Sequence, residues 1–169
     1  MRRSRTILKY LGLLLLLLIL IIALTLVYFI RSPFPKTSGK IKLDGLSAEV
    51  TIQRDDLGVA HIYAENTEDL FFAQGYTHAQ DRFWQMEFWR HIGMGRLSEI
   101  VGEPTLDTDL FIRNLGWNRI AEATAENYRQ NNPELWGILE AYSAGVNAWI
   151  ADNGDNISFN QRILKLSAG

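Results

Sequence analysis

The chain has 169 residues, of which 47% are hydrophobic, and its formal net charge of -2 is the sum of two unlike segments. Residues 1–40 contain seven Lys and Arg and no acid, whereas residues 41–169 contain the other ten Lys and Arg against all nineteen Asp and Glu, a net charge of -9. This acidic balance argues against a nucleic-acid partner for the larger segment, and the absence of cysteine excludes disulfides as a source of its stability.

A long apolar run comes first in the chain, at residues 10–30, YLGLLLLLLILIIALTLVYFI, and it contains no charge. At about 1.5 Å per residue, a helix of this length spans roughly 30 Å, the thickness of the hydrocarbon core of a bilayer. A cleaved signal peptide is disfavoured because the run exceeds a signal h-region and no A-x-A-like site follows it, and core helices are rarely so uniformly Leu and Ile. We therefore predict an uncleaved transmembrane signal anchor.

The charges that flank this run predict its orientation. The basic residues are Arg2, Arg3, Arg5 and Lys9 before the run, and Arg31, Lys36 and Lys40 after it. By the positive-inside rule, residues 1–9 form a cytoplasmic tail, the protein crosses the cytoplasmic membrane once, and everything after about residue 31 lies outside. Residues 31–43, which contain two prolines, are expected to be a linker.

A β-hairpin is predicted directly after the linker. Apolar or long side chains alternate with polar ones over residues 50–54, and residues 59–63 form a second short run rich in β-branched and aromatic residues. Between them, Asp-Asp-Leu-Gly at residues 55–58 supplies residues that favour tight turns.

The remainder of the chain is predicted to be helical. Thr67 occupies an N-cap position, and apolar residues recur every three or four positions from Phe72 to Met86, so a long helix with one apolar face is expected. Gly-Met-Gly at 93–95 should end it. Further helices are expected at residues 96–101, 107–115, 119–130 and 133–150, followed by a polar loop at 152–156. The predicted fold class is therefore α+β.

Motifs for metal binding or nucleophilic catalysis are weak. His78 and Asp81 lie three residues apart and His91 lies ten further on, but a catalytic zinc site needs three protein ligands and no H-E-x-x-H motif occurs. The carboxylates of residues 152–155 lack EF-hand spacing. No G-x-S-x-G or S-x-x-K motif is present, and His61 is the remaining imidazole. No metal site or catalytic triad is predicted.

A polar cluster lies within the most aromatic part of the long helix. Its members are Gln80, Asp81, Arg82 and Gln85. In a continuous helix Asp81 reaches Gln85 at i+4, so a connected hydrogen-bonding set is expected. Asp81 and Arg82 would each need an opposite charge or several backbone groups as partners. Taken alone, these residues fit either a network that sets helix register or a catalytic acid with its cation.

The order of motifs along the chain closely resembles the N-terminal part of the penicillin acylase family. The resemblance rests on GVAHIYAENTEDLFFAQGYTHAQDRFWQMEFWRHIGMGRLSEIVGE, LDTDLFIRNLGW and AYSAGVNAWI. The positions that fit the family pattern are Gly58, His61-Ile62, Asp69, Gly75-Tyr76, Ala79 to Arg82, Gln85 to Glu87, Gly95-Arg96, Glu99, Gly102, Asp109, Arg113 and residues 145–150. The match covers about residues 44–155, and residues 44–169 are interpreted as part of an acylase α chain.

This resemblance implies an N-terminal nucleophile hydrolase with an αββα sandwich, made as a precursor that cuts itself into α and β chains. Such enzymes hydrolyse the amide bonds of acylated small molecules: penicillins, cephalosporins or N-acyl homoserine lactones. The attacking serine and the oxyanion donors belong to the β chain, which is the expected partner. The family also implies calcium in the complete protein, with no ligand that can be placed in these residues.

One departure from the family is plain. None of the thirteen glycines is followed by Ser, Thr or Cys, so the Gly-Ser type processing junction is missing. We therefore expect a truncated precursor that is inactive alone and contains no catalytic residue. The polar residues of the family pattern are predicted to form a structural network: Gln80, Asp81, Arg82, Gln85, Arg96, Glu99, Asp109 and Arg113. The alternative is a membrane-anchored helical protein-interaction module.

Overall fold

The computed structural model describes residues 2–31 and 34–154, with side chains from residue 9 onward, and divides into two units at residues 34 and 35. The first unit contains helix α1 (Arg2–Arg31). Its segment Lys9–Arg31, 23 residues, is long and apolar enough to cross a membrane, and none of its most apolar window is buried. The predicted apolar helix is therefore confirmed. A signal sequence passes the same test of length and composition, so the role of the helix in the membrane stays a prediction.

The second unit begins with a β-hairpin, as predicted. Strand β1 (Thr51–Arg54) pairs antiparallel with β2 (Ala60–Tyr63), with Ile52 opposite Ile62 and Arg54 opposite Ala60. The turn is held by Asp55, whose carboxylate accepts hydrogen bonds from the amides of Leu57 at 3.0 Å and Val59 at 2.8 Å. Within the described residues the sheet has these two strands, so the αββα sandwich stays a prediction.

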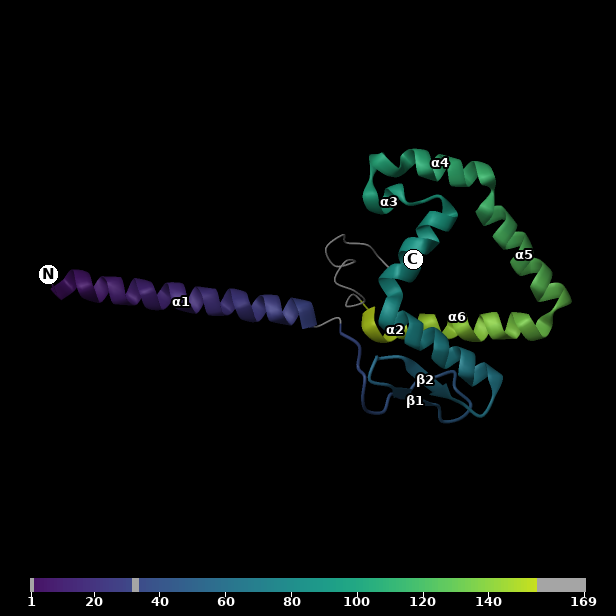
Figure 1. Cartoon of the computed structure of the whole chain (residues 1–169), viewed down its shortest axis with the longest axis horizontal. Helices are drawn as coiled ribbons and strands as arrows, with labels where there is room; N and C mark the ends of the chain where they lie inside the picture. The colour runs from purple at the N-terminus through teal and green to yellow at the C-terminus, as the bar shows by residue number, and fades with distance from the viewer. Residues whose placement is uncertain (1, 32–33, 155–169) are drawn as a thin grey trace. The chain divides into compact units, whose positions relative to one another are not determined.

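Helices make up the rest of this unit (Figure 1). They are α2 (Thr67–Met94), α3 (Ser98–Val101), the 3₁₀ turn η1 (Glu103–Thr105), α4 (Leu106–Leu115), α5 (Trp117–Asn131) and α6 (Pro133–Asn153). The predicted helices are all found, and their ends differ from the prediction by a few residues. The predicted polar loop began at residue 152, but α6 continues to Asn153, and residues 155 and 156 lie outside the described part.

The ends of α2 show how local chemistry sets helix boundaries. The N-cap is Asn66 rather than the predicted Thr67, because the Asn66 side chain accepts a hydrogen bond from the amide of Asp69 at 2.7 Å. The helix ends at the predicted glycine: Gly95 adopts the left-handed conformation, with φ of 63°, and its amide bonds to carbonyls of the last turn.

The core lies where α2 crosses α6. Tyr76, Ala79 and Phe83 of α2 pack with Trp149 of α6, and the rings of Phe83 and Trp149 are 5.2 Å apart at their centroids. Partly buried hydrophobic residues complete it, including Leu43 of the segment before the hairpin. The predicted apolar positions of α2 therefore face a helix that lies more than fifty residues further along the chain.

Two glycines allow the crossing to be this close. A Cβ at Gly75 would overlap the carbonyl oxygen of Tyr142, and a Cβ at Gly145 would overlap that of Phe72. Each helix thus presents a glycine to the backbone of the other. Because the obstructing atoms are backbone atoms, no side-chain rotation could relieve the overlap.

Candidate functional site

The predicted polar cluster lies where α2 meets the hairpin, and its partner is Arg54 of β1. The Arg54 guanidinium donates to both carboxylate oxygens of Asp81 at 2.8 Å, and to the side-chain oxygen of Gln80 at 3.0 Å. Gln80 in turn donates to the carbonyl of Lys36 at 3.0 Å. The Arg54 and Asp81 side chains are 16% and 28% exposed, so this bidentate pair is partly shielded from water. The network joins the linker, the hairpin and α2.

The other half of the predicted cluster lies elsewhere because α2 is kinked at this point. The backbone of Arg82 has φ of -140° and ψ of 20°, which is not helical, and the i+4 relation between Asp81 and Gln85 is therefore lost. Both Arg82 and Gln85 are exposed, and among the described residues their side chains make no hydrogen bond or ion pair. The prediction of one connected set of four is wrong, since it assumed a continuous helix.

Sequence reasoning missed the role of Arg54, although a signal was present. In a strand, alternate side chains share a face, so Arg54 lies on the same face as Ile52. An arginine at a position where the pattern expects an apolar residue indicates a charged partner across that face.

A second network closes the corner between α2 and α4. Asp109, which is 2% exposed, accepts hydrogen bonds from the amides of Leu97 at 2.7 Å and Ser98 at 2.8 Å. Arg113, one turn further along α4, donates from Nε to the carbonyl of Gly95 at 2.7 Å. Burial opposes ionisation of Asp109, but the hydrogen bonds from Ser98 and Leu97 outweigh it and lower its pKa.

The predicted residues Arg96 and Glu99 belong to the same corner. Arg96 donates to both carboxylate oxygens of Glu99, at 2.8 and 2.7 Å, on the solvent side of the turn. This hydrogen bonding lowers the pKa of Glu99 and raises that of Arg96. The structure therefore separates the eight predicted network residues. Gln80 and Asp81 bind Arg54, Arg82 and Gln85 are exposed, and Arg96, Glu99, Asp109 and Arg113 lie together at the corner.

A third polar centre, at Asp69, joins the start of α2 to residues 47 and 48. Asp69 is 2% exposed and accepts from the Ser47 amide at 2.9 Å, the Ser47 hydroxyl at 2.7 Å, the Ala48 amide at 2.9 Å and the Asn66 side chain at 2.7 Å. The hydrogen bond from the Ser47 amide is the largest of the contributions that lower the pKa of Asp69 to about 2. Burial acts in the opposite direction but is outweighed. The sequence identified Asp69 only as a first-turn acid and a position of the family pattern, because the approach of residues 47 and 48 is a tertiary contact.

The histidines considered as ligands or bases have separate partners. His91 is buried, and its Nδ1 donates to the Glu87 carbonyl at 2.9 Å, since a carbonyl can only accept. Glu87 is itself buried and pairs with Arg90 at 2.6 Å. His78 contacts the Tyr142 hydroxyl at 3.0 Å, and His61 contacts Asp55 at 3.3 Å. Each imidazole thus has its own partner, and that of His78 lies on another helix, α6.

The described residues contain no preformed cluster of metal-binding side chains. They bring no three His, Cys, Asp or Glu side chains together in a group suited to a metal. The buried aspartates Asp69 and Asp109 have their oxygens directed at N–H and O–H donors, which is the arrangement for a carboxylate that caps backbone amides.

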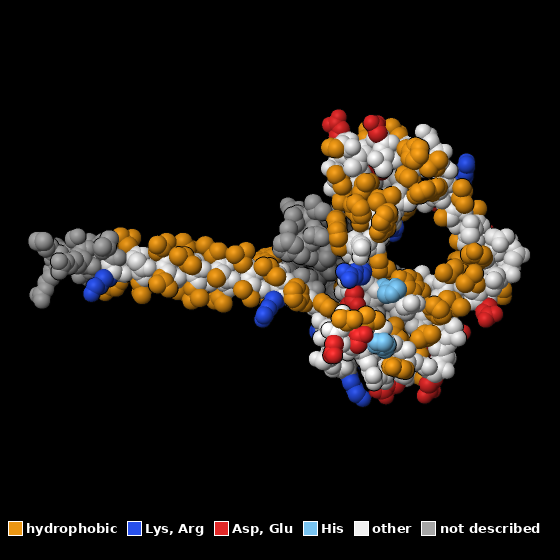
Figure 2. Space-filling view, viewed as in Figure 1, with side chains coloured by type: hydrophobic (Ala, Val, Ile, Leu, Met, Phe, Trp, Pro, Cys, Tyr) orange, Lys and Arg blue, Asp and Glu red, His pale blue; other side chains and the backbone are white. Residues whose placement is uncertain are grey.

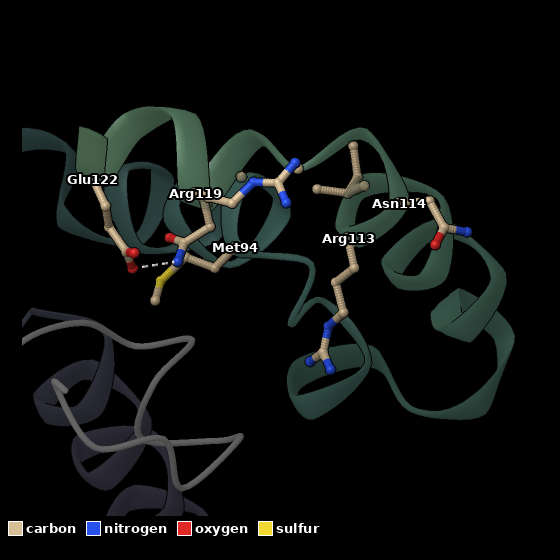
Figure 3. A pocket seen from close by; sticks show the side chains of 9 residues that line it. Met94, Arg113, Asn114, Arg119 and Glu122 are labelled. Carbon is tan, nitrogen blue, oxygen red and sulfur yellow. Dashed lines mark hydrogen bonds between the residues drawn. The ribbon is translucent and has the colours of Figure 1, made fainter. Parts of the chain in front are cut away.

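A pocket of about 420 Å³ lies between the end of α2 and helices α4 and α5. Figure 3 shows that the guanidinium groups of Arg113 and Arg119 point in different directions, so they do not converge on one anion. Asn118 donates to Glu122 at 2.7 Å. The described lining contains no Ser, Thr, Cys or His, and the pocket therefore offers neither a nucleophile nor an imidazole base.

Comparison with known proteins identifies clear relatives. A family model described as penicillin amidase matches residues 49–167. The chain is 37% identical over 122 residues to penicillin acylase 2 proenzyme of Pseudomonas sp. (strain SE83), covering 72% of this chain and 15% of that protein. It is 40% identical over 116 residues to the acyl-homoserine lactone acylase QuiP of Pseudomonas aeruginosa, covering 69% and 13%. With penicillin G acylase of Escherichia coli it shares 37% over 118 residues, covering 70% and 13%.

The fold also has a counterpart among solved structures. Thermostable penicillin G acylase from Alcaligenes faecalis superposes with a TM-score of 0.61 at 21% sequence identity, covering 72% of this chain and 64% of that chain. At this identity the likeness concerns the fold. The chain spans only 13% to 15% of the length of the curated relatives named above.

Proposed function

The chain belongs to the penicillin amidase family, and we propose that it forms the N-terminal part of a membrane-anchored amidohydrolase precursor that hydrolyses acylated small molecules. The observation that carries the proposal is the family match over residues 49–167, together with three relatives that are 37% to 40% identical and named as acylases. Family membership also weighs against an independent interaction module, because such a module has no reason to retain the acylase pattern.

In this proposal the described residues are a scaffold rather than the catalytic machinery. Their polar centres, at Asp69, Asp81 and Asp109, are occupied by hydrogen-bond donors of other segments, so none is left to act as a general acid or base. No glycine of the 169 residues precedes Ser, Thr or Cys. The family's N-terminal serine nucleophile is therefore supplied by another part of the protein, and residues 1–169 alone should not hydrolyse amides.

Chain lengths support a two-chain enzyme. This chain covers 64% of the solved acylase chain but only 13% to 15% of the curated relatives, so the solved chain is several times shorter than those relatives. One relative is named a proenzyme. We infer that the precursor is cut, that residues from about 44 onward belong to the α chain, and that the β chain is their partner.

We infer the substrate class from the relatives' names. Two are named for penicillin and one for acyl-homoserine lactones, all of which are N-acyl derivatives of small amines. Helix α1 would hold the enzyme at the cytoplasmic membrane with its N-terminus inside and the remainder outside. For calcium, the proposal rests on the family resemblance alone.

The direct test is hydrolysis by the complete gene product. It should be expressed with its membrane anchor, purified in detergent and incubated with penicillin G and with N-acyl homoserine lactones of short and long acyl chains. Release of the free amine is followed with fluorescamine. We expect the complete protein to hydrolyse at least one class, and residues 1–169, prepared identically, to hydrolyse none. A processed complete protein that releases amine from neither class would refute the proposed function.

A further inference from the structure

Three of the five lysines of the chain lie in one short segment at the start of the second unit. They are Lys36, Lys40 and Lys42, and residues 36–42, here called the basic segment, contain no acid and are all exposed. Lys40 lies 3.5 Å from Glu49, but the two side chains are 92% and 79% exposed, and such a pair contributes little. Lys36 and Lys42 make no ion pair within the described part of the chain. All three ammonium groups are therefore available to a partner.

The backbone of the basic segment is fixed to the folded unit near both ends. Gln80 of α2 donates a hydrogen bond to the carbonyl of Lys36 at 3.0 Å. Leu43, the residue directly after the segment, packs against the core between α2 and α6. The lysines are thus displayed from a held backbone rather than from a free tail, so less conformational entropy is lost when they bind a partner.

The rest of the second unit has the opposite charge. Residues 43–169 contain nine Lys and Arg against nineteen Asp and Glu, a net charge of -10. In the view of Figure 2, Asp and Glu side chains lie at several places on the surface of this unit. An anionic surface would attract the basic segment and repel the remainder, and the charge distribution therefore favours one orientation of the unit toward such a surface.

The basic segment follows the predicted membrane span closely. Lys36 comes five positions after Arg31, the last residue of α1, and five residue steps cover at most about 18 Å of extended chain. Figure 2 shows hydrophobic side chains along α1. Tyr10 at one end of the apolar run, and Tyr28 and Phe34 at the other, are 64% to 69% exposed, and aromatic residues are enriched at both membrane–water interfaces. With α1 in a bilayer, the chain keeps the basic segment near the lipid headgroups.

We propose that the basic segment binds the anionic phospholipid headgroups of the outer face of the cytoplasmic membrane and holds the second unit at that surface. This inference rests on the proposed function, because it takes α1 as an uncleaved anchor. Each lysine near an anionic bilayer strengthens attachment about fivefold, so three give roughly a hundredfold. A protein partner fits less well: Ile41, 45% exposed, is the one apolar residue of the segment, whereas protein interfaces have an apolar centre.

Fluorescence of the complete protein in lipid nanodiscs tests this inference. The 169 residues contain no cysteine, so Ile41→Cys and the control Asn131→Cys, at the exposed end of α5, each add one thiol for the environment-sensitive dye NBD. The wild type, labelled identically, gives the background from the rest of the protein. The discs contain phosphatidylcholine alone or with phosphatidylglycerol. Fluorescence lifetimes and quenching by doxyl-labelled lipid give the ratio of lipid-bound to water-exposed dye.

The probe in the basic segment should respond to lipid charge. We expect the ratio for Ile41→Cys to be at least about tenfold higher with phosphatidylglycerol than without it, and the difference to disappear in about 1 M salt, where the Debye length falls to about 3 Å. The Asn131→Cys probe should show no lipid contact in either disc. Equal ratios for Ile41→Cys in the two lipids would overturn the inference.

Charge variants show whether the lysines carry the effect. The test variant combines Lys36→Gln, Lys40→Gln and Lys42→Gln, and it keeps the Lys36 carbonyl that Gln80 binds. The matched control loses three exposed arginines of the acidic remainder: Arg82→Gln, Arg119→Gln and Arg129→Gln. With the dye at position 41, the ratio in phosphatidylglycerol discs should fall at least about tenfold in the test variant and less than about twofold in the control. An equal fall in both would assign the effect to net charge and overturn the inference.

Amide hydrolysis, measured on the same preparations, separates this inference from the proposed function. Lysine-dependent lipid contact in a processed protein that releases no amine would support the lipid-binding segment and remove the function. An active protein whose mature N-terminus lies after Arg31 has no anchor, which would overturn the inference and leave hydrolysis standing. A dye at position 41 that is already shielded from water in detergent, without lipid, would assign the segment to another part of the protein and overturn the proposed partner.

Discussion

Replacing Gly145 by alanine should break the crossing of α2 and α6. The added Cβ would overlap the Phe72 carbonyl oxygen and lie 2.9 Å from the Tyr76 amide nitrogen, distances that real Cβ atoms do not tolerate. Overfilling a packed core costs about 1–3 kcal/mol when side chains can adjust. Here the obstructing atoms are backbone, so the helices must separate and loosen the Phe83–Trp149 contact. A destabilisation of about 3 kcal/mol is expected, after the gain of about 1 kcal/mol that alanine brings to a helix.

The same helix contains a matched control. Gly137 lies in α6, and a Cβ there would meet no atom within 4 Å. Gly137→Ala should therefore stabilise the protein by about 0.5–1 kcal/mol through helix propensity alone. Urea unfolding of the complete protein in nonionic detergent, followed by tryptophan emission, measures both. The reasoning is refuted if Gly145→Ala is as stable as the wild type, or if both alanines shift the midpoint in the same direction.

Three further changes test the polar centres. Asp81→Ala removes the partly exposed bidentate partner of Arg54 and should cost about 1–2 kcal/mol and impair self-cleavage more than substrate preference. Arg82→Ala, at an exposed position without a hydrogen-bond or ion-pair partner among the described residues, should change stability by less than about 0.5 kcal/mol in the same urea titration. The pKa of Asp69 falls from 3.8 to about 2 on folding, so its contribution to the free energy of unfolding, about 2 kcal/mol, is present above pH 4 and lost as the pH falls toward 2. Asp69→Asn should therefore flatten the part of the urea-stability profile between these pH values. An unchanged profile would contradict the assignment. Burial and Asp152 raise the Tyr76 pKa to about 12, and burial also raises the pKa of Tyr142. Absorbance at 295 nm should therefore show fewer phenols titrating between about pH 10 and 11 in the wild type than in the unfolded chain, and Tyr76→Phe should reduce that difference.

The local features of this protein could be predicted because they depend on short stretches of chain. The apolar run of residues 10–30, the hairpin around residues 55–58 and the end of α2 at Gly95 each follow from periodicity or from the backbone preferences of neighbouring residues. For Asp109 and Arg113, the sequence indicated only that they are positions of the family pattern and belong to a polar network. Which amides those side chains bind required the structure.

The polar cluster of α2 shows where the sequence stopped being sufficient. The aromatic residues around Asp81 indicated that it needed an opposite charge or several backbone groups as partners, since a carboxylate among aromatic side chains is costly without them. The partner, Arg54, lies 27 positions away, and the kink at Arg82 turns the rest of the cluster toward solvent. The approach of the two helices at Gly75 and Gly145 is likewise a contact between distant segments. Such contacts depend on how whole elements pack against each other, and hydrophobic periodicity describes only the face that each element presents.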